Sequence, residues 1–272
     1  GQRDQTDLLI GLQYSYELFP SFSAFTRERS KEKRFNQELR LVSQHDGPFS
    51  WIGGLYYNTL KGNGNSREFT PGYSQYLLGT GASGVWRPDD LEYYSEGQTE
   101  LDEQAVYAEL SYDLTEKWQV TVGARYYEYD LRTQDATDLP LLYTTIVGDR
   151  GPNDILLDYE FGGQKDDGSL FKFNTSYQFT DDVMMFATVS EGFRIGNSNG
   201  VPLCDPSTGG QQNVCAQPAE FEYFADSTTN YEIGIRTQWF DRRLTLNGSV
   251  YYVEWNDPQL ATQTAVGNTP IV

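Results

Sequence analysis

The stretch "LDEQAVYAELSYDLTEKWQVTVGARYYEYD", residues 101–130, decides the fold, because two alternating runs flank a short polar turn. One parity carries apolar residues such as Val106 and Val122, and the other carries polar residues such as Glu109 and Arg125. A run of about ten residues with one apolar face has the length that a tilted β-strand needs to cross a bilayer. The stretch therefore predicts a hairpin of two transmembrane strands.

The same plan recurs in three further hairpins, at residues 35–58, 169–194 and 228–255. The four turns are centred near Asp46, Glu116, Asp181 and Asp241, so successive turns are roughly 60 to 70 residues apart. Two strands and a turn use less than half of that interval, and the remainder must form long connections at the opposite end. Short turns on one side and long loops on the other are typical of outer-membrane barrels, with the short turns in the periplasm.

Composition supports a barrel over a helical membrane protein. Aromatic residues make up 15% of the chain, with 20 Tyr, and the mean hydropathy is −0.59. No run of 18 apolar residues is present, so the sequence offers no transmembrane helix. Tyr and Trp gather at strand ends, where barrels carry aromatic girdles, although Tyr also favours strands in general. The expected girdle residues are Tyr112, Trp118, Tyr126, Tyr127, Tyr177, Tyr231, Trp239, Tyr251 and Tyr252.

Charged residues within the predicted strands fall on the parity opposite the apolar stripe, which predicts that they face the lumen. An Arg or Lys facing lipid at mid-membrane costs roughly 2–4 kcal/mol, so this placement is a separate test of the barrel. The segment 183–194 is less regular, and Glu191 falls on the lipid parity unless a bulge near Gly192 resets the alternation. The expected lumen-facing residues are Glu109, Arg125, Lys172, Glu232 and Arg236.

Several phrases, in order along the chain, resemble barrel segments of TonB-dependent receptors. They are "FNQELRLVS", "AVYAELSYDLTEKWQVTVGARY", "KFNTSYQFTDDVMMFATVSEGFR" and "TTNYEIGIRTQWFDRRLTLNGSVYYVEW". The resemblance implies an all-β transmembrane antiparallel barrel of about 22 strands, closed by an N-terminal plug. It also implies energised uptake of a scarce nutrient, such as an iron–siderophore complex, cobalamin, haem or a glycan, through the Gram-negative outer membrane.

The strand pattern accounts for about nine of those strands. Because neither a signal peptide nor a plug precedes the strands, and the last residues lack the terminal aromatic residue usual for the family, residues 1–272 are expected to be part of the barrel domain of a longer chain. The plug and the C-terminal strands are then absent from this sequence. The predicted strands are 8–18, 34–43, 50–58, 103–113, 118–130, 169–179, 183–194, 228–239 and 243–255.

The predicted loops are the expected place for ligand specificity. Residues 58–102 carry aromatic side chains among Gly, Pro and acidic residues, and such rings can stack on a sugar, a flat organic ligand or a catecholate ring. The alternative is that these rings pack the loops against one another. The candidate ligand-binding residues are Tyr73, Tyr76, Trp86, Tyr93 and Tyr94.

Cys204 and Cys215 are the only cysteines, and an outer-membrane protein matures in the oxidising periplasm, so we expect a disulfide between them. His45 is the only histidine and lies in a predicted periplasmic turn. This leaves no base for a serine or cysteine triad and no Cys/His metal site, so we expect no catalysis, no bound metal and no cofactor.

The expected partners follow from this architecture. They are outer-membrane lipid and lipopolysaccharide, a small nutrient ligand, and the TonB complex through an N-terminal region missing from this sequence. A net charge of −19 argues against nucleic acid, which needs clustered Lys and Arg. A passive porin and a surface-exposed binding or adhesin barrel remain as alternatives. A plug domain would distinguish a TonB-dependent transporter from both.

Overall fold

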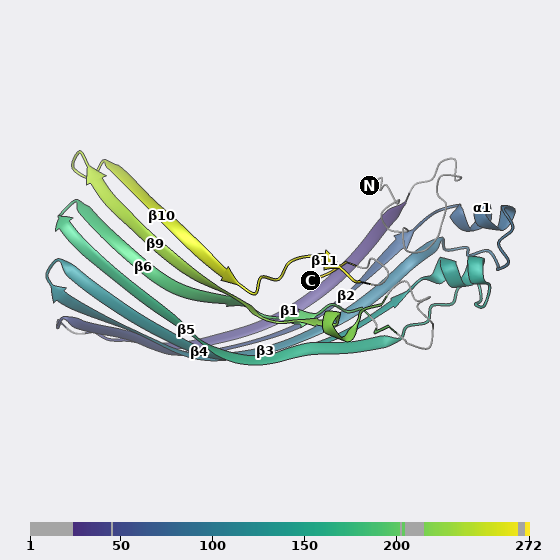
Figure 1. The fold of residues 1–272 in the computed structure, drawn as a ribbon, viewed down its shortest axis with the longest axis horizontal. Coiled ribbons are helices and arrows are strands. Elements are labelled where there is room, and N and C mark those ends of the chain that lie inside the picture. Colours follow the sequence, from purple (N-terminus) through teal and green to yellow (C-terminus); the bar gives the residue numbers. More distant parts are fainter. Residues whose placement is uncertain (1–23, 45, 202, 205–214, 266–269) are drawn as a thin grey trace.

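In the computed structural model, which describes residues 24–44, 46–201, 203–204, 215–265 and 270–272, one antiparallel sheet dominates the protein. The sheet has eight strands in the order β1-β2-β3-β4-β5-β6-β9-β10. Within this sheet, each strand pairs with the strand that precedes or follows it in the chain, except that β6 pairs with β9 after a long connection (Figure 1). The strands are β1 (Phe25–Val42), β2 (Phe49–Phe69), β3 (Leu91–Thr115), β4 (Trp118–Asp138), β5 (Tyr159–Thr180), β6 (Val183–Arg194), β9 (Asp226–Trp239) and β10 (Leu244–Asn256).

Short turns lie at one end of the curved sheet and long connections at the other (Figure 1). The turns between β3 and β4 and between β5 and β6 each contain two residues, 116–117 and 181–182. The β9–β10 turn places Phe240, Asp241 and Arg242 at positive φ, between 53° and 66°. All four predicted turns are confirmed, and so is the predicted asymmetry of the two ends. The first predicted strand, 8–18, and His45 lie outside the described residues.

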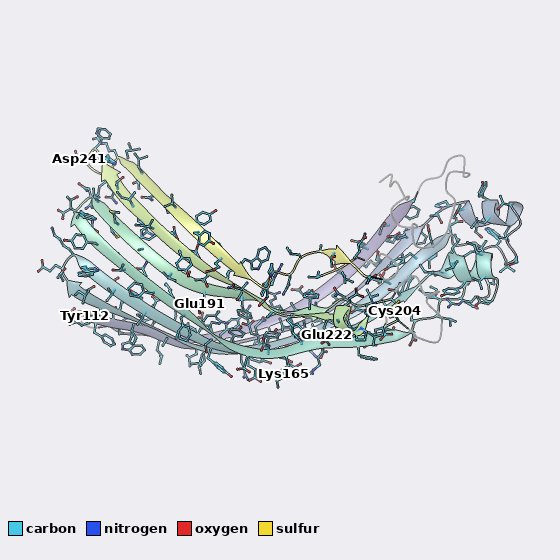
Figure 2. All side chains as sticks on the ribbon, viewed as in Figure 1. Tyr112, Lys165, Glu191, Cys204, Glu222 and Asp241 are labelled. Atoms are coloured by element: carbon cyan, nitrogen blue, oxygen red, sulfur yellow. A yellow bond between two sulfur atoms is a disulfide. The ribbon has the colours of Figure 1, made fainter. Side chains whose placement is uncertain are left out.

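The two faces of the sheet differ as the alternation predicts, and we call them the outer (apolar) face and the inner (polar) face. Tyr112 lies near the turn end, and Lys165 lies farther along the strands (Figure 2). An apolar face this large has no protein to cover it within the described chain, and lipid is the environment that suits it. Exposed outer-face residues include Leu39, Leu55, Val106, Leu110, Val122, Phe171, Phe173, Ile233, Ile235, Leu246 and Val250.

The strands extend well beyond the predicted segments toward the loop end. β2 continues to Phe69 and β3 begins at Leu91, so the predicted loop 58–102 is wrong, and the connection is only 70–90. The ladder continues because backbone hydrogen bonds need no apolar face. Beyond the hydrocarbon both faces are polar, so the alternation that revealed the strands is absent there.

The connections at the loop end contain short helices and two-residue strands. Helix α1 (Tyr73–Gly79) lies in the β2–β3 connection, and a short π-helix, Leu142–Val147, lies in the β4–β5 connection. The β6–β9 connection carries β7 (Asn197–Ser198), a 3₁₀ turn at Pro218–Glu220, and β8 (Glu222–Tyr223). The strands β11 (Thr262–Gln263) and β12 (Pro270–Ile271) follow β10 and pair with each other. None of the helices in the described ranges has the length and apolar character needed to span a bilayer.

Candidate functional site

Charged side chains on the inner face pair across strands. Lys172 Nζ on β5 donates to Glu109 Oε2 on β3 at 2.8 Å, reaching over the intervening β4. The β4 residue between them is Gly123, and a Cβ there would lie 3.6 Å from Lys172 Cβ and 3.7 Å from Glu109 Cγ. Arg125 donates to Glu103 Oε1 at 2.8 Å. A Cβ at these distances would make ordinary van der Waals contact, so the charge pair spans three strands over a position that carries no side chain but would tolerate a small one.

The remaining two residues predicted to face the lumen lie on β9. Glu232 is in register with Thr188 of β6, which is in register with Asn174 of β5. Arg236 lies over the ring of Phe186, with its guanidinium carbon 5.2 Å from the ring centroid. Register and contacts thus put all five predicted residues on the same face of the sheet, although they form separate contacts and no single cluster.

An aromatic cluster covers the inner face toward the loop end. The rings of Tyr127 and Phe193 stack with centroids 3.7 Å apart, and Tyr129 lies 6.3 Å from Phe193. Tyr127 and Tyr129 are only 6% and 1% exposed. Tyr127 was expected in a girdle, and that expectation is wrong, because the residue shares the parity of Arg125 and points to the inner face. The alternation already carried this signal.

Strand β6 leaves β5 where this cluster forms. Its pairing with β5 ends at Ser190 and Lys172, whereas its pairing with β9 runs without a register shift to Arg194. The carboxylate of Glu191 accepts a hydrogen bond from the Phe171 backbone N–H at 2.9 Å. The expected bulge near Gly192 is therefore replaced by a local separation of two strands, and a side-chain carboxylate takes the place of the missing ladder partner.

Hydrogen bonds to Asp226 hold the loop ends of β6, β9 and β10 together. Arg194 donates to Asp226 Oδ2 at 2.5 Å, and Trp255 Nε1 donates to the same oxygen at 3.0 Å. The backbone N–H of Gln259 donates to it at 3.1 Å. Because Arg194 ends β6 and Asp226 begins β9, these hydrogen bonds fix both ends of the long β6–β9 connection.

The five aromatic residues expected to bind ligand lie in three different surroundings. Tyr73 and Tyr76 on α1 stack at 6.2 Å, and Tyr73 is buried, which raises the pKa of its hydroxyl above the usual value. Tyr94 is buried on β3 under the guanidinium of Arg67, 5.1 Å from the ring centroid, and Tyr93 is half-buried. Trp86 is 47% exposed. The structure joins Tyr73 to Tyr76 but does not gather all five residues.

Two of the long connections are locked together around Arg87, whose side chain is fully buried. Its guanidinium pairs with Asp89 at 2.8 Å and donates to Thr144 Oγ1 at 3.2 Å and to the Asp154 carbonyl at 2.8 Å. The backbone of Gly84 donates to the Thr145 carbonyl at 3.1 Å. A Cβ at Gly84 would lie 2.1 Å from the Thr144 carbonyl oxygen, so only glycine permits this approach. Sequence reasoning did not identify this lock.

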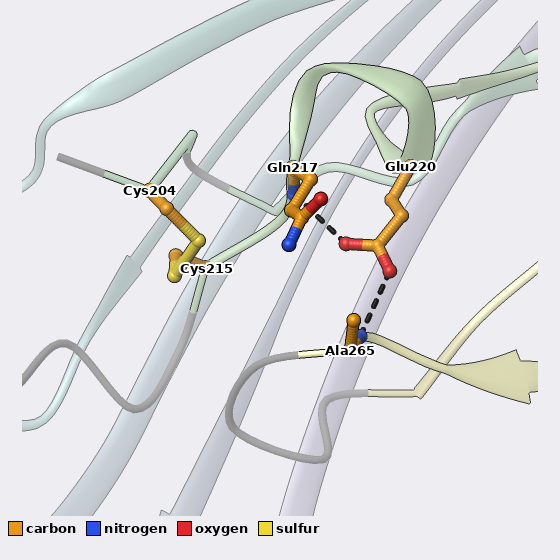
Figure 3. The surroundings of a disulfide bond; sticks show 5 residues. All are labelled: Cys204, Cys215, Gln217, Glu220 and Ala265. Atoms are coloured by element: carbon orange, nitrogen blue, oxygen red, sulfur yellow. Dashed lines mark hydrogen bonds between the residues drawn. A yellow bond between two sulfur atoms is a disulfide. The ribbon is translucent and has the colours of Figure 1, made fainter. Parts of the chain in front are cut away.

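The third long connection is held by a disulfide between Cys204 and Cys215, with an S–S distance of 1.99 Å (Figure 3). Nearby, Glu220 accepts hydrogen bonds from the backbone N–H groups of Gln217 and Ala265, each at 2.8 Å (Figure 3). These two hydrogen bonds hold the pKa of Glu220 below its usual value. The carboxylate thus joins the β6–β9 connection to the segment after β10.

The connections at the loop end are thus fixed to one another, and they carry exposed aromatic and charged side chains. Such an arrangement is suited to binding a ligand. Exposed aromatic side chains there include Trp86 and Phe224. Arg150 lies 3.9 Å from the ring centroid of Tyr143 and pairs with Asp138 at 2.6 Å. Within the described ranges, no group of three or more His, Cys, Asp or Glu residues is arranged to hold a metal ion.

Comparison with known proteins identifies relatives along nearly the whole chain. The family model described as "TonB dependent receptor-like, beta-barrel" matches residues 2–272. The pesticin receptor of Yersinia pestis is 25% identical over 249 residues, which cover 91% of this chain and 30% of the relative. The chain thus spans less than a third of the length of that curated relative.

Solved structures show the same fold. The ferric yersiniabactin uptake receptor FyuA from Yersinia pestis superposes with a TM-score of 0.64 at 22% identity, covering 89% of this chain and 31% of that chain. The closed form of the ferric-catecholate import receptor Fiu from E. coli K12 has a TM-score of 0.55 at 14% identity, covering 90% and 34%.

Proposed function

The chain belongs to the TonB-dependent receptor β-barrel family, and we propose that it forms part of an outer-membrane receptor that takes up a ferric siderophore. The match of the family model to residues 2–272 carries the proposal. Members of this family are outer-membrane receptors, so the exposed outer face of the sheet meets lipid and the loop end meets the cell exterior.

The choice of a siderophore rests on the relatives. FyuA is named as a receptor for ferric yersiniabactin and Fiu as an importer of ferric catecholates. Cobalamin, haem and glycans are the competing ligands. Siderophores present aromatic or carbonyl-rich surfaces around the iron, and exposed rings at the loop end can stack on them. Of the five aromatic candidates, Trp86 is the most exposed, and we assign it first contact with the ligand.

The rest of the barrel is part of the same proposal. At the outer edges of β1 and β10 the described sheet has no further strand, and an open strand edge is not tolerated in lipid. Further strands of the full-length protein complete the ring, and a plug closes it. The TonB complex then engages the region before the barrel.

The ligand is tested with full-length protein purified in detergent. Binding is measured with iron-loaded siderophores of the phenolate, catecholate and hydroxamate classes, alongside haem, cobalamin and an oligosaccharide. We expect saturable binding of one siderophore class. Tight binding of only haem, cobalamin or the oligosaccharide would overturn the choice of ligand while leaving the receptor family intact.

The contact residue has a matched control. Trp86→Ala should raise the Kd of the bound siderophore by about three- to tenfold, the loss of one ring contact. Val85→Ala changes the adjacent residue, which is equally exposed, and should leave the Kd unchanged. Equal effects from the two substitutions would remove Trp86 from the site.

A further inference from the structure

A strip of cations runs along the outer face of β1 and β2, and we call it the basic strip. On β1 the alternation is charged on both faces: cations hold the outer parity and acids such as Glu28 and Glu32 hold the inner parity. The outer parity is secure, because the β1–β2 register runs from Phe25 to Val42 without a shift and includes Leu39 and Leu41 of the apolar face. The strip comprises Arg27, Arg29, Lys31 and Lys33 of β1 and Lys61 and Arg67 of β2.

The strip begins where the apolar outer face ends. Phe35 ends the run of large apolar residues that includes Leu39 and Leu41 on that face of β1; Lys33 lies two residues beyond it toward the loop end, in register with Lys61, and the next large apolar residue, Phe25, stands at the far end of the strand. Two residues span about 7 Å along a strand, and the polar headgroup layer is roughly 5–8 Å thick. Lys33 and Lys61 thus lie at headgroup depth, and Lys31 and Arg29 lie just above it.

Two tyrosines mark the same boundary on neighbouring strands. The hydroxyl of Tyr57 donates to Asp102 at 3.4 Å, and that of Tyr126 donates to Asp167 at 2.9 Å. Tyrosines with apolar rings below and hydrogen-bonded hydroxyls above are typical of a membrane–water interface.

Within the strip, Lys61 pairs with Glu100 of β3 at 2.8 Å, whereas three cations of β1 have no acidic partner among the described residues. On β4 and β5, Arg132 pairs with Asp130 at 2.7 Å and Lys165 pairs with Glu128 at 3.4 Å. Among the residues that the structure describes, Arg29, Lys31 and Lys33 form no ion pair, and all three are exposed. Unpaired cations side by side repel one another, and an anion that bridges them relieves this repulsion.

A groove next to the strip has room for a polar headgroup. Its volume is about 360 Å³, and its lining includes Arg29, Lys31, Asn63, Asn65 and Glu96. The two asparagines offer hydrogen bonds to sugar hydroxyls or phosphate oxygens. The Glu96 carboxylate accepts hydrogen bonds from the hydroxyls of Tyr159 and, at 2.7 Å, of Tyr94, so both of its oxygens are already engaged.

We propose that the basic strip binds the lipid A phosphates of lipopolysaccharide in the outer leaflet, with Lys31 and Lys33 as its central contacts. The proposal rests on the outer-membrane placement in the proposed function, and it is independent of the transported ligand. Charge and depth both select a phosphorylated glycolipid headgroup: the cations lie within reach of the phosphates, and the groove lies at the level of the sugars. Each cation near an anionic lipid surface contributes about 1 kcal/mol, or roughly fivefold in affinity.

The test uses full-length protein in detergent and two matched double variants on β1. Lys31→Gln with Lys33→Gln removes two outer-face charges, whereas Arg34→Gln with Arg40→Gln removes two charges of the inner parity. Native mass spectrometry measures binding of lipid A and of dephosphorylated lipid A. We expect the outer-face double variant to bind lipid A about tenfold or more weakly, and the inner-face double variant to bind it as the unmodified protein does.

Three results would overturn the proposal: equal effects of the two double variants, equal binding of dephosphorylated lipid A, or displacement of lipid A by an equal concentration of inorganic phosphate. The last would indicate a site for free anions. Membrane placement is checked separately by labelling Gln75→Cys, at the exposed surface of α1, with an impermeant maleimide on intact cells. Absent labelling would contradict the proposed function, whereas normal labelling with unchanged lipid A binding would contradict only the strip.

Discussion

At the scale of single residues, parity decides the environment of each side chain in the sheet. Val122 and Arg125 on β4 are three residues apart and lie on opposite faces, the first half-exposed on the apolar face and the second paired with Glu103. Tyr126 and Tyr127 are adjacent, yet the first is exposed on the outer face and the second is buried in the aromatic cluster. Neighbours in sequence therefore differ more than residues two apart.

The faces are tested by two substitutions in the full-length barrel. Val122→Arg should lower the free energy of unfolding by about 2–4 kcal/mol, because it places a charge against lipid. Arg125→Gln should cost only about 0–1 kcal/mol, since it removes a partly exposed ion pair. Refolding titrations into lipid vesicles measure both values. Equal tolerance at the two positions would refute the assignment of faces.

Glu220 makes the loop end sensitive to acid. Hydrogen bonds from Gln217 and Ala265 lower its pKa in the folded protein, so the contact is fully present above the usual Glu value of about 4.3. It is lost as the pH falls through the lower, folded-state pKa. Hydrogen exchange at Ala265, corrected for the intrinsic pH dependence, should show constant protection from pH 7 to about 5 and a decline below about pH 4. In Glu220→Gln, protection should be low and independent of pH; a decline that persists would assign it to another group.

At the scale of elements, the strands continue past the membrane and their connections are locked to one another. β3 runs from Leu91 to Thr115, more than twice the length that a bilayer requires. The extension carries the loops away from the headgroups, and Arg87 then joins the β2–β3 connection to the β4–β5 connection. Such a framework orders the loops before any ligand binds, which lowers the entropic cost of binding.

Arg87→Gln tests that lock. Loss of the hydrogen-bonded charge should destabilise the two connections locally by about 2–3 kcal/mol, because the buried Thr144 hydroxyl and Asp154 carbonyl lose their donor. Hydrogen exchange of peptides from residues 70–90 and 139–158 should rise together, while the strands stay protected. The control, Arg132→Gln, removes an exposed ion pair and should change neither connection. Faster exchange in only one connection would show that the two are not coupled through Arg87.

At the scale of the whole molecule, a barrel of the family's size is too wide for its side chains to fill. We therefore expect the full-length barrel to be plugged, since an open one would leak. Opening a plugged barrel requires work, and the outer membrane supplies neither ATP nor a usable ion gradient, so in the proposed function the energy comes mechanically from the inner membrane.

Energised uptake is the corresponding prediction for cells that carry the full-length protein. Radiolabelled iron delivered by the cognate siderophore should accumulate only while the proton-driven TonB complex is intact. Surface binding at 4 °C should persist after that complex is deleted. Accumulation at the full rate without the complex would favour the passive porin.

The sequence alone determined the strand hairpins, their four turns, the two faces and the family. Alternation of period two is a local property, and it survives wherever one face meets lipid and the other meets water. The same alternation places Tyr127 on the inner face, although the prediction of the aromatic girdle considered only its position at a strand end. The strand extensions carried no such signal, because polar residues stand on both of their faces.

Only the tertiary structure decided which residues from distant connections meet. Arg87 contacts Thr144 and Asp154, and Glu220 contacts Ala265, across tens of residues of chain. No local pattern encodes such pairs, since their geometry depends on how the curved sheet brings its loops together. The same holds for the basic strip: its cations alternate visibly in the sequence, but their alignment with Lys61, and their height above the apolar face, follow from the register of β1 on β2.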